Sequence, residues 1–403
     1  MEKKFSNDNF HLYTEIVFGK DTEHEVAKLV RKYGGTKVMV VTGSASAKKS
    51  GLLDTVISLL EQADIPVVEF SGVKANPQRS FAEKGYQLAV DEGVDFLLGV
   101  GGASAIDTTK AIALGLANEG GFWQFYSGES VPKKMAPVGT IHTLAAAGSE
   151  TSGSTVLVDD VSGSFAKKGM MYPDVVRPVF AIMNPELTYS MNRYQTAAGA
   201  SDILAHTFDR YFNSVSCALS DEFSEGLMRT VIRYTKKALD VPNDYEARAE
   251  LMLAGSFSHN GLTGLGGKSP SAGTHNLEAN LSGNYDTVHG AGLALVMPPW
   301  LEEVLARGTD SQIDRVAHFA VNVFGVYPDY SDAKSTALQG IHRFRGWLDS
   351  IGMPNTLNAL GIGEEKLDEI VANCRCAPDG IMHGYIDFDK KQVNDFFARL
   401  IER

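Results

Sequence analysis

The sequence predicts an N-terminal α/β domain built on a parallel sheet, followed by an all-helical C-terminal domain. From about residue 36, short β-branched runs alternate with helical stretches, as in TKVMVVTG, LLDTVISLLEQAD and IPVVEFSGV. This strand–helix–strand repetition is typical of a parallel sheet covered by helices on both faces. Beyond Pro185 the strand signals fade and long periodic helices dominate. We therefore expect domains at residues 1–190 and 191–403.

Each element is expected where an apolar run or a helical periodicity supports it. Three strands are expected from the first alternating runs and three more from later apolar runs, at 36–43, 65–73, 94–102, 134–145, 154–160 and 177–185. Helices of the first domain are expected at 52–64 and 78–93. Those of the second are expected at 193–212, 219–240, 244–262, 312–325 and 334–352.

Composition restricts the class of partner. The 403 residues are 44% hydrophobic and carry a formal net charge of −12 with no dense Lys/Arg run. Nucleic acids and anionic membranes require basic surfaces, so small molecules are the expected partners. The three cysteines cannot form a disulfide framework, and the N-terminus lacks the apolar core of a signal peptide, so we expect a cytoplasmic protein. Cys374 and Cys376 form a CxC pair that could bind metal, but no second thiol pair exists to complete a shell.

Four residues of the helical half have the character of a metal site. Asp202 and His206 lie four residues apart and share a helix face. His275 and His289 frame a segment rich in Gly, Ser and Asn. Three imidazoles and a carboxylate form the N/O shell that holds a catalytic divalent ion. The alternative is that these imidazoles are core or capping groups bound to backbone carbonyls.

The α/β half carries two signals for a nucleotide. The strand VDFLLGV runs into Gly101, Gly102 and Ser104 and then a helix, so backbone N–H groups at the helix start can face a pyrophosphate. The turn after the first strand, from Gly43 through Ser44 and Ser46 to two lysines, has no acidic residue for a ribose 2′-hydroxyl. We therefore favour NADP(H) over NAD(H). The alternative for the glycine turn is that it only allows tight packing of the strand against the helix. The alternative for the serine and lysine turn is that it is simply exposed to solvent.

These motifs in this order resemble the iron-containing (group III) alcohol dehydrogenase family, and the resemblance covers the whole chain. It rests on FGK at 18–20, GGASAIDTTK at 101–110, GSE at 148–150, NPEL at 184–187 and HGAGLALVMPPW from His289. The most similar branch contains NADPH-dependent butanol dehydrogenases and aldehyde reductases. The resemblance implies a two-domain, homodimeric dehydrogenase with Fe²⁺ or Zn²⁺ between its halves.

The resemblance also implies roles for individual residues. The four metal ligands would be Asp202, His206, His275 and His289, which act in catalysis through the metal. Gly101, Gly102 and Ser104 match the pyrophosphate loop, and the remaining cofactor-binding residues would be Gly43, Ser44, Ser46, Asp107, Thr143, Leu144 and Lys168.

Two positions depart from the family pattern. Many members have a histidine four residues after the third ligand, proposed as a proton carrier, where this chain has Ala279. Ala147 stands in place of a threonine that would contact the cofactor. The first hypothesis is a metal-dependent, NADP-linked alcohol dehydrogenase that works mainly as an aldehyde reductase, on short or medium primary alcohols such as butanol. A glycerol dehydrogenase or a dehydroquinate-synthase-like lyase is the alternative on this fold, and a noncatalytic nucleotide-binding protein is the alternative of another class.

Overall fold

The computed structural model describes residues 3–4, 10–43, 46–268, 273–374 and 376–402. The chain forms two compact units. The sheet unit comprises His11–Met191 and Asn243–Asn260, and the helical unit comprises Met1–Phe10, Asn192–Pro242 and Gly261–Arg403.

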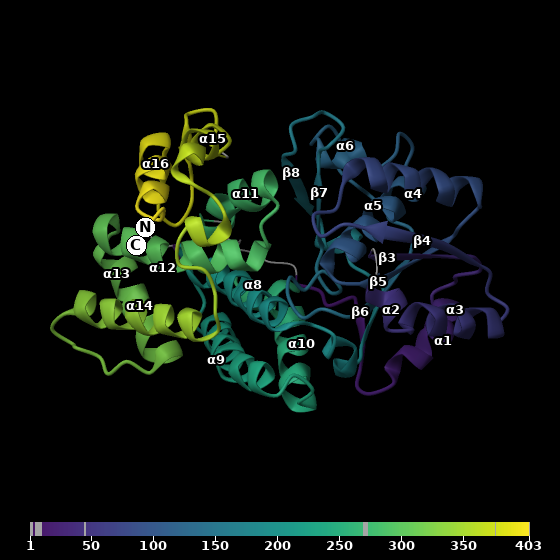
Figure 1. The fold of residues 1–403 in the computed structure, drawn as a ribbon, viewed down its shortest axis with the longest axis horizontal. Helices are drawn as coiled ribbons and strands as arrows, with labels where there is room; N and C mark the ends of the chain where they lie inside the picture. Colours follow the sequence, from purple (N-terminus) through teal and green to yellow (C-terminus); the bar gives the residue numbers. More distant parts are fainter. Residues whose placement is uncertain (1–2, 5–9, 44–45, 269–272, 375, 403) are drawn as a thin grey trace. The chain divides into compact units, whose positions relative to one another are not determined.

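A six-stranded, wholly parallel sheet forms the centre of the sheet unit (Figure 1). Its strand order is β2-β9-β6-β5-β3-β4, so the chain crosses over between neighbours as parallel strands require. Its strands are β2 (Glu15–Phe18), β3 (Val38–Gly43), β4 (Val67–Val73), β5 (Phe96–Gly101), β6 (Val138–His142) and β9 (Phe180–Met183).

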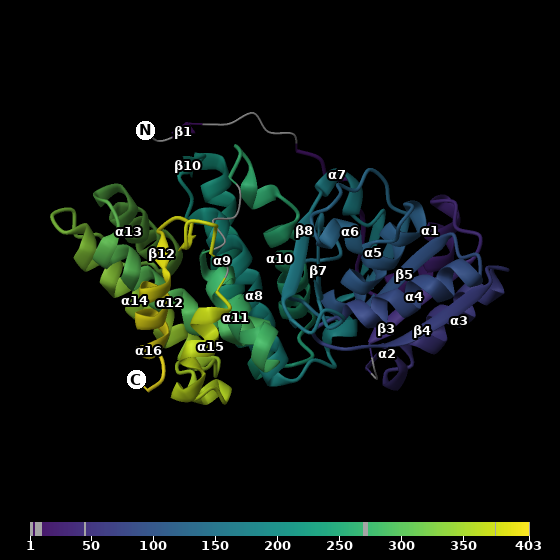
Figure 2. The same ribbon diagram turned by 90° about the horizontal axis from the view of Figure 1, so that it is seen from above.

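Both faces of this sheet are covered, as the continuous apolar strands predict. Successive residues of β3 point to opposite faces, so Val38 and Val40 pack in one apolar layer and Met39 and Val41 in the other. The first layer includes α1 (Val26–Lys32) and α3 (Leu52–Gln62), and the second includes α4 (Arg79–Asp91) and α5 (Ala103–Ala117). The expected α/β fold class is confirmed. In Figure 1, α4 and α5 lie above the sheet and α1 and α3 below it, and Figure 2 shows the same unit from above.

One expected strand was wrongly placed. Residues 154–160 were expected to extend the parallel sheet, but β7 (Ser154–Val158) instead pairs antiparallel with β8 (Lys167–Met171). The reason lies in side-chain contacts with α5, because Asp107 accepts hydrogen bonds from the Val156 N–H at 2.9 Å and anchors β7 to that helix. The edge strand β2 was not expected, because it is short and pairs with β9, far along the chain.

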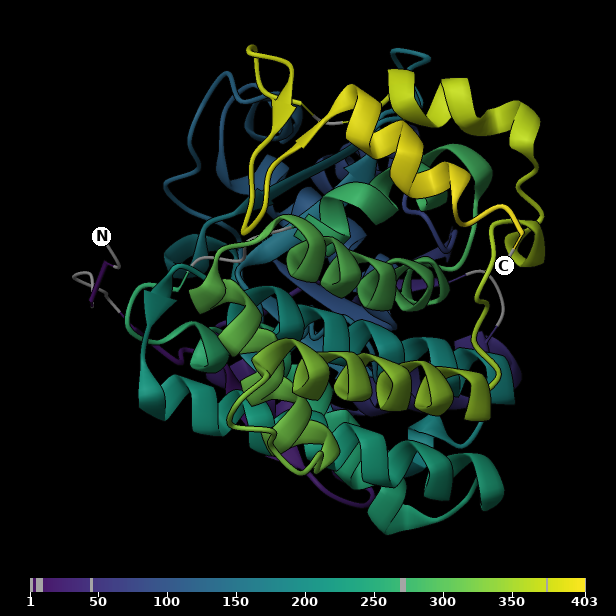
Figure 3. The same cartoon turned by 90° about the vertical axis from the view of Figure 1, so that its left-hand side faces the viewer.

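The helical unit is built around α8 (Arg193–Tyr211), which is buried along nearly its whole length. An Asn192–Gln195 capping box begins this helix, and an aromatic cluster that includes Phe208, Trp300 and Phe319 packs at its C-terminal end. The other helices, seen from the side in Figure 3, are α9 (Ala218–Asp240), α11 (Gly273–Tyr285), α12 (His289–Arg307), α13 (Asp310–Phe324), α14 (Ala333–Ser350), α15 (Leu367–Ala372) and α16 (Lys390–Ala398).

The remaining elements are short, with one exception. The exception is α10 (Tyr245–His259), which the limits 1–190 and 191–403 assign to the helical half but which groups with the sheet unit. It is held there because Thr151 Oγ1 donates to the Ser256 carbonyl at 3.1 Å. The short elements are β1 (Lys3–Lys4), α2 (Ser46–Lys49), α6 (Trp123–Tyr126), α7 (Pro173–Val176), β10 (Val215–Ser216), β11 (Ile381–Met382), β12 (Phe388–Asp389) and the 3₁₀ turns Thr22–Glu25, Pro185–Thr188, Leu262–Gly264, Asn358–Leu360 and Glu364–Lys366.

Within the described part of the chain, no helix combines the length and apolarity needed to cross a lipid bilayer.

Candidate functional site

Three of the four predicted metal ligands converge within the helical unit. Asp202 lies in α8, His275 in the first turn of α11, and His289 begins α12. One carboxylate oxygen and two ring nitrogens from these residues lie within 4.8 Å of one another. Helices from distant parts of the sequence thus bring their polar side chains to a single point.

The fourth residue, His206, lies beside this group but outside the 4.8 Å set. Its ring centroid is 4.7 Å from that of His275, and its Nδ1 is 3.1 Å from Asp202 Oδ1. The same Nδ1 is 2.9 Å from the Asp202 carbonyl oxygen, one helical turn earlier. Contact with this carbonyl favours a proton on Nδ1, which leaves Nε2 as the ring's lone-pair nitrogen.

The donor set fits a divalent transition-metal ion. The Nε2 atom of His275 is buried and has no hydrogen-bond partner among the described residues. His289 Nε2 is 3.9 Å from Asp202 Oδ1. A buried ring nitrogen without a partner costs free energy unless an ion or a water satisfies it. Imidazole nitrogens with one carboxylate suit Fe²⁺ or Zn²⁺.

Two buried carboxylates that the sequence analysis did not identify hold the imidazoles in place. Asp209 Oδ2 lies 2.7 Å from His275 Nδ1, and Thr274 donates to the other oxygen of Asp209. The Glu278 carboxylate contacts His289 Nδ1. Each carboxylate favours the tautomer that presents Nε2 to an ion. Spacing was the available signal, since Asp209 lies three residues after His206, and Glu278 three after His275.

Electrostatics favour an ionised Asp202. Burial alone raises the pKa of Asp202, but the neighbouring imidazoles, His206 foremost, lower it to about 2. Burial lowers the pKa of His206, which keeps this ring neutral and able to donate a lone pair. Around neutral pH this part of the site therefore offers an anionic oxygen beside a neutral ring nitrogen.

The helices α12 and α8 pack closely because Gly290 of α12 lies directly against the backbone of Ala198 in α8. A Cβ added at Gly290 would lie 1.9 Å from the Ala198 carbonyl oxygen. Glycine is therefore required directly after His289 for the first turn of α12 to approach the helix that carries Asp202.

The predicted pyrophosphate turn joins β5 to α5 in the sheet unit. Gly101 has φ of +151°, and Gly102 is the N-cap of α5. The Thr143 N–H donates to the Gly101 carbonyl at 3.1 Å, and a Cβ at Gly102 would lie 3.2 Å from the Leu144 Cβ. Four predicted cofactor residues therefore lie together at the carboxyl edge of the sheet, where such sheets bind nucleotides.

The other predicted cofactor residues are more dispersed. Gly43 ends β3, next to β5, whereas Lys168 is exposed on β8, outside the six-stranded sheet. Ser104 Oγ donates to the Ala75 carbonyl. Ser44 lies outside the described residues, and Ser46 begins α2, with its side chain not described.

Asp107 and Lys110 support the loop that follows β6. Asp107 accepts a hydrogen bond from Ser149 Oγ at 2.5 Å. The Lys110 ammonium is fully buried and donates to the carbonyl oxygens of Ser149 at 2.7 Å, Ser152 at 3.0 Å and Ser154 at 2.8 Å. Burial lowers the pKa of Lys110 to about 8, while Asp107 raises it. The described contacts of Asp107 are thus with this loop and with β7.

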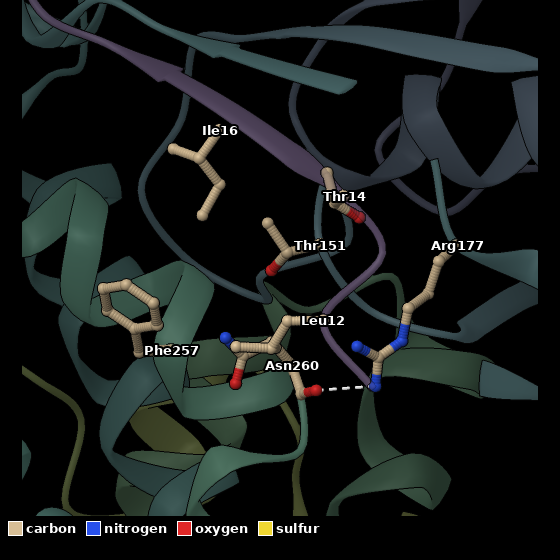
Figure 4. A pocket seen from close by; sticks show the side chains of 7 residues that line it. All are labelled: Leu12, Thr14, Ile16, Thr151, Arg177, Phe257 and Asn260. Carbon is tan, nitrogen blue, oxygen red and sulfur yellow. Dashed lines mark hydrogen bonds between the residues drawn. The ribbon is translucent and has the colours of Figure 1, made fainter. Parts of the chain in front are cut away.

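A separate cavity of about 140 Å³ lies elsewhere in the sheet unit (Figure 4). Arg177 is one of its lining residues and donates to the Asn260 carbonyl oxygen at 2.6 Å. The lining is mainly apolar and includes none of the predicted metal or nucleotide residues: Leu12, Thr14, Ile16, Thr151, Arg177, Phe257 and Asn260. This cavity therefore gives no support to a second reaction centre.

Comparison with protein families matches nearly the whole chain. Residues 14–185 match the iron-containing alcohol dehydrogenase model, and residues 196–401 match the C-terminal model of the Fe-containing alcohol dehydrogenase family. The chain belongs to the iron-containing alcohol dehydrogenase family. It is therefore a metal-dependent oxidoreductase that acts on alcohols and uses a nicotinamide cofactor.

Individual relatives agree with this assignment. The chain is 36% identical to NADH-dependent butanol dehydrogenase A of Clostridium acetobutylicum, over 89% of this chain and 90% of that protein. It is 31% identical to the NADPH-dependent aldehyde reductase YqhD of Escherichia coli, over 91% and 92%. The crystal structure of an NADH-dependent butanol dehydrogenase A from Thermotoga maritima matches with a TM-score of 0.92 and 32% identity, over 99% of this chain and 100% of that one.

Proposed function

We propose that this enzyme reduces short or medium aldehydes to primary alcohols such as butanol, with NADPH as the preferred cofactor and a divalent ion held by Asp202, His206, His275 and His289. The observation that carries the proposal is the convergence of Asp202, His275 and His289 around a buried ring nitrogen that has no partner among the described residues. The names of the butanol dehydrogenase and aldehyde reductase relatives supply the substrate class.

In this proposal some residues of the chain bind the cofactor and others orient the side chains that hold the ion. A bound nicotinamide supplies hydride chemistry, and a bound divalent ion stabilises negative charge on the carbonyl oxygen. The turn at Gly101 and Gly102, with the N-terminus of α5, binds the pyrophosphate through backbone N–H groups. Asp209 and Glu278 contact Nδ1 of His275 and His289, which would leave Nε2 of each ring available to hold the ion. Because Ala279 cannot carry a proton, the alcohol oxygen receives its proton through water or another group.

The metal assignment is tested by removing single ligands. We expect His206→Ala and His275→Ala each to lose the ion and to lower kcat/KM for butanal by several orders of magnitude. Metal content is measured by mass spectrometry after loading with iron, zinc or manganese, and its loss separates a ligand from a residue that only shapes the site. Near-normal turnover in a metal-depleted His275→Ala preparation would overturn the assignment.

The NADPH preference rests on the turn after β3. Gly43 has no acidic neighbour up to Lys48, and Lys48 and Lys49 are exposed. Among the relatives, the E. coli reductase is NADPH-dependent and the clostridial butanol dehydrogenases are NADH-dependent, so the assay must compare both cofactors directly. We expect Ser44→Asp to raise KM for NADPH and to leave KM for NADH nearly unchanged. An unaltered ratio would show that this turn does not select the cofactor.

The choice of substrate separates the proposal from its rival on this fold. A glycerol dehydrogenase would oxidise glycerol with kcat/KM comparable to or above that for butanol. We expect butanal reduction to dominate in a panel of aldehydes and polyols.

We further propose that the protein is a cytoplasmic homodimer. The cytoplasmic location is supported by three cysteines without a disulfide, and the dimer by the family resemblance. Light scattering after gel filtration measures the oligomeric state.

A further inference from the structure

Two cysteines in the helical unit face each other outside the metal site. Cys374 and Cys376 lie between α15 and β11, and their sulfur atoms are 3.1 Å apart. The Cys376 N–H donates to the Cys374 carbonyl at 2.9 Å, which holds the two residues close to each other. The two thiols therefore lie within reach of bond formation.

The two thiols have different surroundings. Cys374 is 9% exposed, and burial together with contact with Cys376 raises its pKa to about 12. Cys376 is partly exposed, so it is the more accessible of the two residues to an oxidant in solution. Neither cysteine belongs to the cluster of metal-binding side chains found among the described residues. One thiol is therefore accessible and the other is held beside it.

We propose that Cys374 and Cys376 form a redox-active dithiol, which a hydroperoxide converts to an intramolecular disulfide and a small dithiol reductant restores. The Cys376 sulfur attacks one oxygen of hydrogen peroxide, so an S–O bond forms and the O–O bond breaks. The departing hydroxide takes the thiol proton and leaves as water, and Cys376 becomes a sulfenic acid. The Cys374 sulfur then attacks the Cys376 sulfur, so an S–S bond forms and the S–O bond breaks. Hydroxide leaves with the Cys374 proton as water, and two electrons have passed to the peroxide.

The short loop gives this disulfide a particular character. Only one residue separates the two cysteines, so closing the bond constrains very little of the unfolded chain and adds little stability. Exposed or strained disulfides are the easily reduced ones. The pair is thus suited to reversible modification rather than to a structural cross-link.

The sequence offers a direct test, because trypsin cleaves after Arg375, between the two cysteines. Digestion of the denatured reduced protein separates the peptides Leu367–Arg375 and Cys376–Lys390. After the metal-loaded enzyme is treated with hydrogen peroxide and blocked with N-ethylmaleimide, we expect these peptides to stay joined under non-reducing conditions. Dithiothreitol should separate them. Two separately alkylated peptides, or over-oxidised Cys376 beside alkylated Cys374, would overturn the proposal.

Serine variants identify the partner sulfur. Cys217 is buried, so Cys217→Ser should leave the joined peptides unchanged. Cys376→Ser, at the partly exposed position, should abolish them without disturbing the fold. A joined product that contains the Cys217 peptide, or that runs as a cross-linked dimer on a non-reducing gel, would contradict an intramolecular pair. The readout is peptide mass, so it does not depend on which aldehyde or cofactor the enzyme uses.

Discussion

At the scale of single residues, the proposed metal site depends on two carboxylates that lie behind the proposed ligands. Asp209 and Glu278 are both almost fully buried, and each contacts the Nδ1 atom of one imidazole. A charged acceptor fixes the ring orientation and increases the basicity of the other nitrogen. Asp209 and Glu278 are therefore positioning residues for the ion.

We predict that Glu278→Gln weakens ion binding by about 10- to 100-fold, because the amide keeps the size of the side chain but not its charge. The dissociation constant for Co²⁺ or Zn²⁺ is measured by competition with a chromogenic chelator. Glu302→Gln is the matched control on α12, since Glu302 pairs with Arg345. Equal affinity in Glu278→Gln and wild type would remove Glu278 from the site, whereas no binding in wild type would refute the metal proposal itself.

Lys110 is a buried residue whose charged side chain holds backbone carbonyl groups in place. Its ammonium donates to three carbonyl oxygens, two in the loop after β6 and one at the first residue of β7, and a methionine there would leave these oxygens without that donor. We predict that Lys110→Met lowers the free energy of unfolding by about 3 kcal/mol. Urea unfolding followed by circular dichroism measures the change. Lys84→Met, at an exposed position of α4, is the control and should change it little.

At the scale of elements, the contact between α8 and α12 determines whether the proposed ligands meet. We predict that Gly290→Ala lowers the melting temperature and weakens ion binding, because the new methyl group must push α12 away from Ala198. Gly346→Ala in α14 is the matched control, since a Cβ there meets open space, and it should stabilise by about 0.5–1 kcal/mol. Normal ion binding in Gly290→Ala would show that the helices adjust without cost to the site.

A second interhelical contact gives a prediction about pH. Glu303 on α12 pairs with Arg307 at 2.7 Å and with Arg399 at the end of α16. Burial raises the pKa of Glu303, but these hydrogen bonds outweigh it and hold the pKa below its usual 4.5. A lowered pKa stabilises the fold above the unfolded value, and this contribution is lost as pH falls through the folded value.

We therefore predict that Glu303→Gln destabilises by about 1.5–3 kcal/mol at pH 7, and by less as pH falls below the usual glutamate value. Melting temperatures of variant and wild type, measured at pH 7 and near pH 4, provide the comparison. A difference that stays constant with pH would show that the carboxylate charge contributes nothing.

At the scale of the whole molecule, the two predicted binding functions lie on separate compact units. The four metal residues belong to the helical unit and the nucleotide residues to the sheet unit. An ion present at 100 times its Kd stabilises the unit that binds it by about 2.7 kcal/mol. We predict that a chelator lowers the melting temperature of wild type, measured by calorimetry. The same chelator should leave His275→Ala unchanged, and an equal drop in both would place the stabilising ion elsewhere.

Local patterns predicted many of the longer helices and strands but not every pairing between them. The 3.6-residue periodicity placed α8 and α9 to within a residue or two, because helix hydrogen bonds are local. The apolar run of β7 predicted a strand but not its partners. In the structure β7 pairs with β8 and with the Asp107 carboxylate, and not with a strand of the parallel sheet. The short edge strand β2 was missed, since its pairing with β9 joins distant segments.

The sequence by itself determined the family, the fold class and the one-turn spacing of Asp202 and His206, because these depend on residue order and on periodicity along one element. Tertiary structure alone decided that His275 and His289 meet Asp202, and that Asp209 and Glu278 stand behind the two imidazoles. These contacts join α8, α11 and α12, and helix packing sets them through close approaches such as that of Gly290 to Ala198. No pattern along a single helix contains that information, because the free energy of packing belongs to the pair of helices.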